Sequence, residues 1–161
     1  MIESEFENLD LARMQQFADA LSKHFKQGDC LLLNGDLGAG KTQFSKFLIQ
    51  ALVKDKIDVP SPTFTIVQTY DSDDLEIWHF DLYRIGDVDE LEEIGWFEDI
   101  KNRLSLVEWP DRLGTYAPKN ALEVSISIQE NDLRCVRLST SDQKWDQHVK
   151  DIKNNMIKDA A

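Results

Sequence analysis

The sequence has little cysteine, no long apolar run and no apolar leader, and each shortage excludes a class of protein. Its two cysteines, Cys30 and Cys135, lie far apart and fit no metal-binding spacing. We therefore expect reduced thiols, as in a cytosolic protein. The acidic start MIESEFENLD lacks the apolar core of a signal peptide, and no apolar run approaches the roughly 18 residues that span a bilayer. The sequence predicts a cytoplasmic protein without a membrane segment.

Basic residues are also scarce. Lysine and arginine total 18 against 30 aspartates and glutamates, so the formal net charge is −12. Such a chain repels a polyanion such as RNA unless a local basic patch overrides its field, and the sequence contains no such patch. We expect no direct nucleic-acid binding by this chain alone.

The 161 residues fit one domain with its own core. Apolar residues at helical spacing predict a helix over 10–25, with Asp10 as N-cap, and another over 41–54. The stretch 87–97 predicts an amphipathic helix in which Asp87 and Glu90 form a capping-box-like start. We divide the chain into a domain over 1–141 and a polar helical tail over 142–161.

Apolar runs and alternating patterns between turn residues predict the strands. Two prolines make 59–62 an extended loop, and the turn DSDD at 71–74 joins two strands into a β-hairpin. The turn QEND at 129–132 joins a second, later hairpin. The expected strands are 29–34, 63–70, 75–84, 104–110, 121–128 and 133–140.

The clearest functional signal is a glycine-rich loop that satisfies G-x-x-x-x-G-K-[ST] between a predicted strand and a predicted helix. Glycines allow backbone N–H groups to turn onto a phosphate, and the helix N-terminus adds its positive dipole end. Lys41 is expected to reach the terminal phosphates, and the Thr42 hydroxyl to bind Mg²⁺. The phosphate-binding residues are Gly35, Asp36, Leu37, Gly38, Ala39, Gly40, Lys41 and Thr42.

A loop of this kind also needs an acidic residue at the end of a neighbouring strand to hold magnesium. Glu108 ends the apolar run LSLVE, and Asp81 ends IWHFD. We assign Glu108 to magnesium and Asp81 to positioning water or supporting the metal from the second shell of ligands; the sequence also allows the reverse assignment.

Other residues near these motifs have two interpretations each. The hydroxyl-rich loop 61–65, which includes Thr63, is either a segment that senses the γ-phosphate or a stiff connector. Trp109 either lies against the nucleotide or fills the core. His79 shares a strand face with Asp81, and we expect a packed or surface histidine rather than a proton-transfer group.

ATP is favoured over GTP, because the base-reading motif N-K-x-D of GTPases is absent and the D-x-x-G string at 111–114 lies beyond Pro110. A small-molecule kinase is the next rival. Kinases clamp a second substrate with arginines and exclude water with a lid, whereas this chain has six scattered arginines and no insertion long enough for a lid.

Four motifs, NGDLGAGKT, VPSPTFTIVQTY, WHFDLYRI and LVEWPDRLG, occur in an order and spacing that resemble the bacterial TsaE (YjeE) family over about residues 8–140. Members are small ATPases required for the threonylcarbamoyladenosine modification of tRNA. The resemblance implies a P-loop NTPase-like three-layer α/β sandwich with a mixed, mainly parallel sheet and antiparallel hairpins. It also implies TsaD and TsaB as partners, with TsaD modifying adenosine 37 of tRNA and this chain hydrolysing ATP to reset the complex between turnovers.

The same resemblance implies roles for single residues. Lys41 and Thr42 hold phosphate and magnesium, Glu108 is a metal ligand, Asp81 is a catalytic carboxylate and Trp109 flanks the nucleotide. Members often carry a threonine near the adenine early in the first helix, where this chain has Met14, so base contacts from that helix, including any by Asp10, are not carried over. Arg134 in the late hairpin is a further candidate nucleotide contact. We expect good ATP binding with slow hydrolysis by the isolated chain; the alternative is a nucleotide-gated binding module without hydrolysis.

Overall fold

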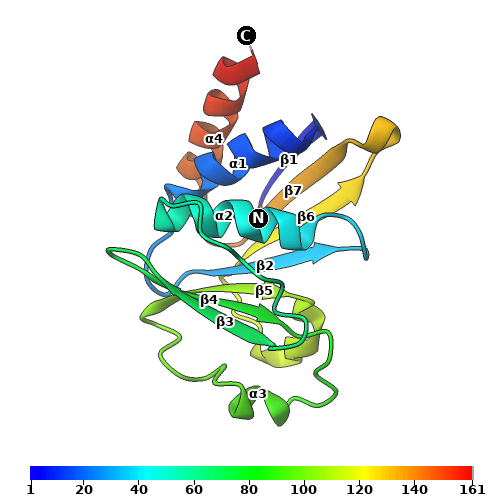
Figure 1. The fold of residues 1–161 in the computed structure, drawn as a ribbon. Helices are drawn as coiled ribbons and strands as arrows, with labels where there is room; N and C mark the ends of the chain where they lie inside the picture. Colours follow the sequence, from blue (N-terminus) through cyan, green and yellow to red (C-terminus); the bar gives the residue numbers. More distant parts are fainter. Residues whose placement is uncertain (161) are drawn as a thin grey trace.

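The structure is a computed structural model that describes residues 1–160, with side chains up to Ile157. In this part of the chain, seven strands form one mixed sheet in the order β1-β7-β6-β2-β5-β4-β3 (Figure 1). Their bounds are β1 Ile2–Leu9, β2 Cys30–Gly35, β3 Val67–Asp71, β4 Glu76–Asp81, β5 Arg103–Glu108, β6 Leu122–Ile128 and β7 Arg134–Thr140.

The centre of the sheet is parallel and its margins are antiparallel. Strands β6, β2, β5 and β4 run in the same direction, whereas β1, β7 and β3 pair antiparallel with their neighbours. Every residue of β5 is buried, as expected for a strand covered on both faces. The mixed sheet with four central parallel strands and two antiparallel hairpins is confirmed.

Helices cover both faces of the sheet, which makes the predicted three layers (Figure 1). One face carries the larger core and the longer helices, and the other carries a smaller core around Trp96 and Leu113. The helices are α1 Leu11–Ser22, α2 Lys41–Val53, α3 Glu90–Glu93 and α4 Trp145–Ala160, with 3₁₀ turns η1 Pro110–Tyr116 and η2 Glu130–Asp132.

Helix α1 begins as its sequence predicts. Asp10 Oδ1 accepts a hydrogen bond from the Arg13 backbone N–H at 2.8 Å, which caps the first turn. Met14, Phe17 and Leu21 bury one face against the core. The helix ends at Ser22, three residues before the predicted boundary at Phe25, which itself remains buried.

Two predicted elements are shorter in the structure. The strand predicted over 63–70 begins only at Val67, because residues 62–65 form a turn in which Ile66 N–H donates to Pro62 O at 2.6 Å. The helix predicted over 87–97 is reduced to α3. Its capping box does not form, because Asp87 Oδ1 accepts from the Asp89 N–H instead of that of Glu90.

Both ends of the chain contribute to the domain. Strand β1, which the sequence did not predict, pairs with β7 at the edge of the sheet. Helix α4 is formed by the segment that we predicted as a helical tail, and its apolar side chains join the core that contains residues of α1 and α2. None of the helices within residues 1–160 is long and apolar enough to cross a membrane. The buried residues of α4 are Trp145, Val149, Ile152 and Met156.

The smaller core is organised by a buried cation. Arg103, at the start of β5, is fully buried and donates hydrogen bonds to the carbonyls of Gly95, Trp96 and Glu98. Its guanidinium lies 4.2 Å from the ring centroid of Trp78. Burial lowers the pKa of Arg103 to about 10. These bonds hold the segment after α3 against the sheet and fix the start of the strand that ends at Glu108.

Candidate functional site

The loop between β2 and α2 has the conformation that its glycines require. A Cβ on Gly35 would lie 2.8 Å from the Ile126 carbonyl oxygen, so the last residue of β2 has no room for a side chain. Gly40 has φ = 106°, a left-handed conformation that other residues rarely adopt, immediately before α2 begins at Lys41. The sequence therefore folds into a tight turn whose backbone leads into a helix N-terminus.

Lys41 is folded over this turn. Its ammonium group Nζ donates to Gly35 O at 2.6 Å and lies 3.8 Å from the ring centroid of Trp109. Burial lowers the pKa of Lys41, while the carboxylates of Glu108 and Asp81 act in the opposite direction. A desolvated cation at the mouth of a glycine turn is well placed to attract an anion.

A chain of side-chain contacts connects the first turn of α2 to the ends of two strands. Thr42 Oγ1 donates to Glu108 Oε1 at 3.1 Å, and Glu108 Oε2 lies 2.6 Å from His79 Nε2. His79 and Glu108 are both buried. The imidazole thus fixes the orientation of the carboxylate that faces Thr42.

Asp81 lies beside Glu108, because the two residues are partners in the register of the parallel pair β4 and β5. Asp81 Oδ2 accepts a hydrogen bond from Thr63 Oγ1 at 3.1 Å, and Oδ1 accepts from the Tyr83 N–H at 3.0 Å. The turn 62–65 is therefore attached to this carboxylate through a single hydroxyl. Both acids stand at the carboxyl edge of the sheet, next to the glycine turn.

These residues surround an open cleft of about 390 Å³. Trp109 and Tyr83 form one wall, with ring centroids 4.9 Å apart. Leu37, at the tip of the glycine turn, and Phe64, in the turn 62–65, are 83% and 84% exposed, so two apolar side chains lie in solvent near the cleft. The lining residues are Leu37, Gly38, Gly40, Lys41, Thr42, Gln43, Thr63, Asp81, Tyr83, Glu108 and Trp109.

A second cavity of about 320 Å³ meets the first at Gly40 and Gln43. Its walls include Met14 and Phe44, which are apolar and buried. Arg134 closes one side, where its Nε donates to Ala39 O at 2.8 Å. The remaining lining residues are Leu9, Asp10, Leu11, Ala39, Phe47 and Asp132.

The structure brings most of the residues that sequence analysis selected to the two cavities, whereas Gly35 and Asp36 line neither of them. Thr63, Asp81, Glu108 and Trp109 face the glycine turn across the first cleft, and Arg134 lies on the other side of that turn. His79 is packed, as expected, but its contact with Glu108 was not predicted. The available signal for this contact was that His79 lies two residues before Asp81, on the same face of the strand next to the one that ends at Glu108. Gln43 and Tyr83 also line the cleft, and no pattern in the sequence distinguished them.

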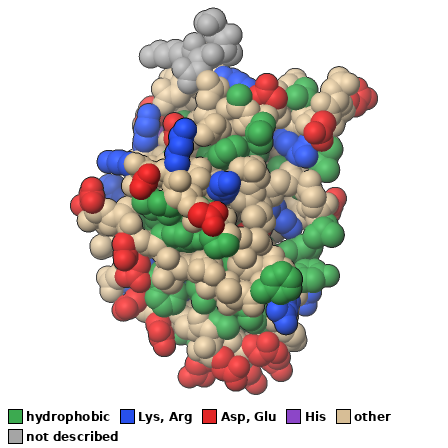
Figure 2. All heavy atoms as spheres, viewed as in Figure 1, with side chains coloured by type: hydrophobic (Ala, Val, Ile, Leu, Met, Phe, Trp, Pro, Cys, Tyr) green, Lys and Arg blue, Asp and Glu red, His purple; other side chains and the backbone are tan. Residues whose placement is uncertain are grey.

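Acidic side chains gather at the end of the molecule where α3 lies (Figure 2). Asp87, Asp89, Glu92 and Glu93 are all exposed there. This distribution agrees with the formal net charge of −12 and leaves no favourable surface for a polyanion at this end.

Parallel strands that end in a glycine turn, followed by a helix and flanked by two carboxylates, define an α/β protein of the P-loop-like class, to which many nucleotide-binding proteins belong. The family model for threonylcarbamoyl adenosine biosynthesis protein TsaE matches residues 9–136. The chain belongs to the TsaE family.

Known proteins agree with this assignment. The chain is 36% identical over 140 residues to the tRNA threonylcarbamoyladenosine biosynthesis protein TsaE of Haemophilus influenzae, covering 85% of each chain. It is 34% identical over 127 residues to the TsaE protein of Rickettsia conorii, covering 79% of this chain and 73% of that protein. The crystal structure of YdiB from Bacillus subtilis superimposes with a TM-score of 0.77 over 95% of both chains at 24% identity, which supports the fold.

Proposed function

We propose that this chain binds ATP with Mg²⁺ and hydrolyses it slowly, as an accessory protein in the N6-threonylcarbamoyladenosine modification of tRNA. The observation that carries the proposal is the convergence of the glycine turn, Lys41, Thr42 and two strand-end carboxylates on one cleft. Membership of the TsaE family supports the link to this tRNA modification.

The cleft supports binding of the phosphates. Backbone N–H groups of the glycine turn and the N-terminus of α2 provide donors, and Lys41 exchanges its bond to Gly35 O for phosphate oxygens. The adjoining cavity supports the nucleoside, because its apolar walls at Met14 and Phe44 fit a base and Arg134 offers hydrogen-bond donors.

The donor set also fits Mg²⁺, which prefers oxygen ligands. Thr42 Oγ1 and Glu108 Oε1 are both oxygens, lie 3.1 Å apart and face the cleft. We propose that these two residues hold the ion, which when bound neutralises charge on the phosphates. His79 keeps the carboxylate of Glu108 in the orientation that this role needs.

For hydrolysis we propose that Asp81 orients the attacking water or supports the metal from the neighbouring strand. Its bond to Thr63 ties the turn 62–65 to the cleft, so a γ-phosphate that competes for the Thr63 hydroxyl changes the position of this turn. This connection supports a conformational switch, in which the position of the turn 62–65 differs before and after hydrolysis and a partner that contacts the turn responds to that difference.

The proposed partners are TsaD and TsaB, and hydrolysis by this chain resets their complex between turnovers. The acidic surface supports an indirect relation to tRNA, in which a partner holds the polyanion. Leu37, in the glycine turn, and Phe64, next to Thr63 in the turn 62–65, are exposed, so they are suited to transmitting the state of the cleft to a partner.

The central experiment is a titration of the full chain with MgATP, comparing Lys41→Ala with Lys46→Ala, which removes the same charge from the same helix outside the cleft. We expect Lys41→Ala to weaken binding roughly 10- to 100-fold, the loss typical of a charged hydrogen bond, and Lys46→Ala to leave it unchanged. Equal affinities for both variants would overturn the proposed site.

The function itself is tested by reconstitution with the cognate TsaD–TsaB pair and substrate tRNA. Multiple-turnover modification is expected only when ATP and this chain are both present, and it should fail with Lys41→Ala. Turnover that continues without this chain, or phosphate transfer from ATP to a small metabolite, would contradict the proposal.

A further inference from the structure

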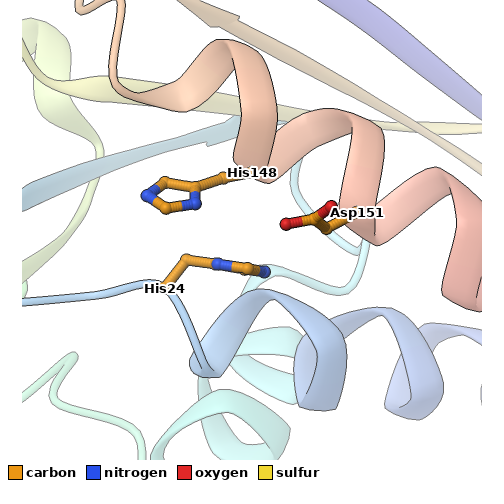
Figure 3. A group of neighbouring side chains, drawn as sticks. All are labelled: His24, His148 and Asp151. Carbon is orange, nitrogen blue, oxygen red and sulfur yellow. The ribbon is translucent and has the colours of Figure 1, made fainter.

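Away from the cleft, three potential metal ligands converge where the turn after α1 faces α4 (Figure 3). His24 lies in that turn, and His148 and Asp151 lie three residues apart on α4, so they share a face of the helix. One ligand atom from each residue lies within 4.8 Å of the other two. The chain has three histidines, and two of them meet here.

Hydrogen bonds do not account for this grouping. Asp151 Oδ1 accepts from Gln147 Nε2 at 3.0 Å, and within the described residues neither imidazole is joined to the carboxylate by a hydrogen bond or ion pair. Bonds of about 2.0–2.2 Å to one ion require donor atoms roughly 3–3.5 Å apart. A bound ion would therefore require the three donor atoms, which lie within 4.8 Å of one another, to close to that spacing.

Packing limits how far these side chains can turn away. The ring centroids of His24 and His148 lie 4.4 Å apart with an interplanar angle of 32°. Trp145, which is 1% exposed, holds His148 from the other side with its ring centroid 5.3 Å away in an edge-on arrangement. In Figure 3 the two imidazoles approach from opposite elements, and the carboxylate of Asp151 points toward the gap between them. All three ligands are half-buried, which leaves an ion access from solvent.

The local charges suit a cation. Burial and, secondarily, the charge of His148 lower the pKa of His24, whereas the carboxylate of Asp151 acts in the opposite direction. Asp151 supplies the negative charge, and the formal net charge of the whole chain is −12.

We propose that His24, His148 and Asp151 form a binding site for a divalent transition-metal ion, and that Zn²⁺ is the ion that this donor set fits best. Two imidazoles and one carboxylate match the ligand preferences of Zn²⁺, whereas Mg²⁺ favours oxygen ligands alone. Three protein ligands leave a fourth position for water. The bound ion ties α4 to the turn after α1 and stabilises the fold, because it links residues 24 and 148 across most of the chain.

The test is calorimetric titration of the EDTA-treated full chain with Zn²⁺ alone, together with thermal unfolding. We expect one Zn²⁺ per chain at this site and, at a free Zn²⁺ concentration about 100 times the Kd, a rise in Tm of roughly 5–10 °C. His148→Gln and Asp151→Asn should each weaken this binding at least tenfold. Asp146→Asn removes the same charge from an exposed position of the same helix and should leave binding unchanged.

Two further variants remove competing sites. Glu108→Gln alters the nucleotide cleft, and Cys135→Ser alters a group formed by Glu5, Glu7 and Cys135. Zn²⁺ binding that survives His148→Gln but is lost in either of these variants would overturn the proposal, as would the absence of Zn²⁺ binding by the parent chain.

A measurement on the parent chain alone keeps the proposal testable if a variant fails to fold. In NMR spectra the ring C–H signals of three histidines are expected. Addition of Zn²⁺ should shift those of His24 and His148 and leave that of His79 in place. Shifts confined to His79 would assign the ion to the nucleotide cleft and refute the proposed site.

Discussion

His79 Nε2 lies 2.6 Å from Glu108 Oε2, and both side chains are buried behind the cleft. The contact joins neighbouring strands β4 and β5, so the carboxylate that faces Thr42 is held by a residue that has no access to the cleft itself. If Glu108 holds the metal as we propose, His79 acts on the cleft through it, as a positioning residue.

The first prediction concerns this contact. His79→Gln should lower the affinity of the nucleotide complex for Mg²⁺ about 10- to 100-fold, because partners that orient a metal ligand typically contribute that much. Nucleotide affinity without Mg²⁺ should change little. Mg²⁺ titrations at fixed ATP measure the first quantity, and ATP titrations without Mg²⁺ measure the second. In Zn²⁺-free buffer, His148→Gln, which lies outside the cleft, is the matched control. An unchanged Mg²⁺ dependence would show that His79 is a packing residue only.

We expect a substitution at Asp81 to impair ATP hydrolysis without impairing ATP binding. Asp81→Asn keeps the size of the side chain but removes its charge, so partner-stimulated hydrolysis should fall at least about 100-fold while ATP affinity stays within a few fold. Phosphate release assays with TsaD–TsaB present measure hydrolysis, and calorimetric titration measures ATP affinity. Asp111→Asn removes an exposed charge near Lys41 and serves as the control. If the parent chain itself releases no phosphate with its partners, the chain is a nucleotide-gated binding module.

Nucleotide binding should change the fluorescence emission of Trp109. The ammonium of Lys41 lies 3.8 Å from the centroid of its ring, and phosphates that attract this cation change the surroundings of the indole. Nucleotide should therefore alter tryptophan emission in the parent, and Trp109→Phe should remove most of that change while affinity stays within about threefold. Trp78→Phe, on the smaller core, should keep the change. If Trp109→Phe shows the same change in emission as the parent chain, another tryptophan is responsible for it.

Cys30 should make stability depend on pH in alkaline solution. Burial raises the pKa of the Cys30 thiol to about 12, whereas an unfolded thiol ionises near 9. Between these values the unfolded chain releases a proton that the folded chain retains, so the free energy of unfolding falls as pH rises, by up to about 1.4 kcal/mol per pH unit. We would measure the free energy of unfolding by urea between pH 8 and 10.5. It should fall less steeply with pH in Cys30→Ala than in the parent chain, and an equal fall in both would show that Cys30 does not cause the pH dependence.

Elements with a local signal were predictable from the sequence. The Asp10 cap, the glycine turn and the alternating strands of the two hairpins each follow from short-range chemistry, and the structure contains them. The positions of Asp81 and Glu108 followed from strand ends, because parallel neighbours bring their carboxyl edges together.

Elements that depend on distant partners were not predictable. Strand β1 alternates three glutamates with Ile2, Ser4 and Phe6, so its apolar face is short, and it forms because β7 offers an unpaired edge more than 120 residues later. Beyond α3, Gly95 has a left-handed φ of 80°, which ends the helical geometry, and the carbonyls of Gly95, Trp96 and Glu98 bind Arg103. The charge of Arg103 gave no sign that it would be buried.

Helix α1 has the second cavity, which we propose for the nucleobase, beside its first turn, at Leu11 and Met14, and His24 just beyond its last turn. Its 12 residues form a rigid rod about 18 Å long. A bound base that displaced one end of this helix would move the other end relative to α4, so our two proposals together predict that the cavity and the histidine pair are coupled through α1. Thermodynamic reciprocity then requires that whatever nucleotide does to the affinity for Zn²⁺, Zn²⁺ does equally to the affinity for nucleotide.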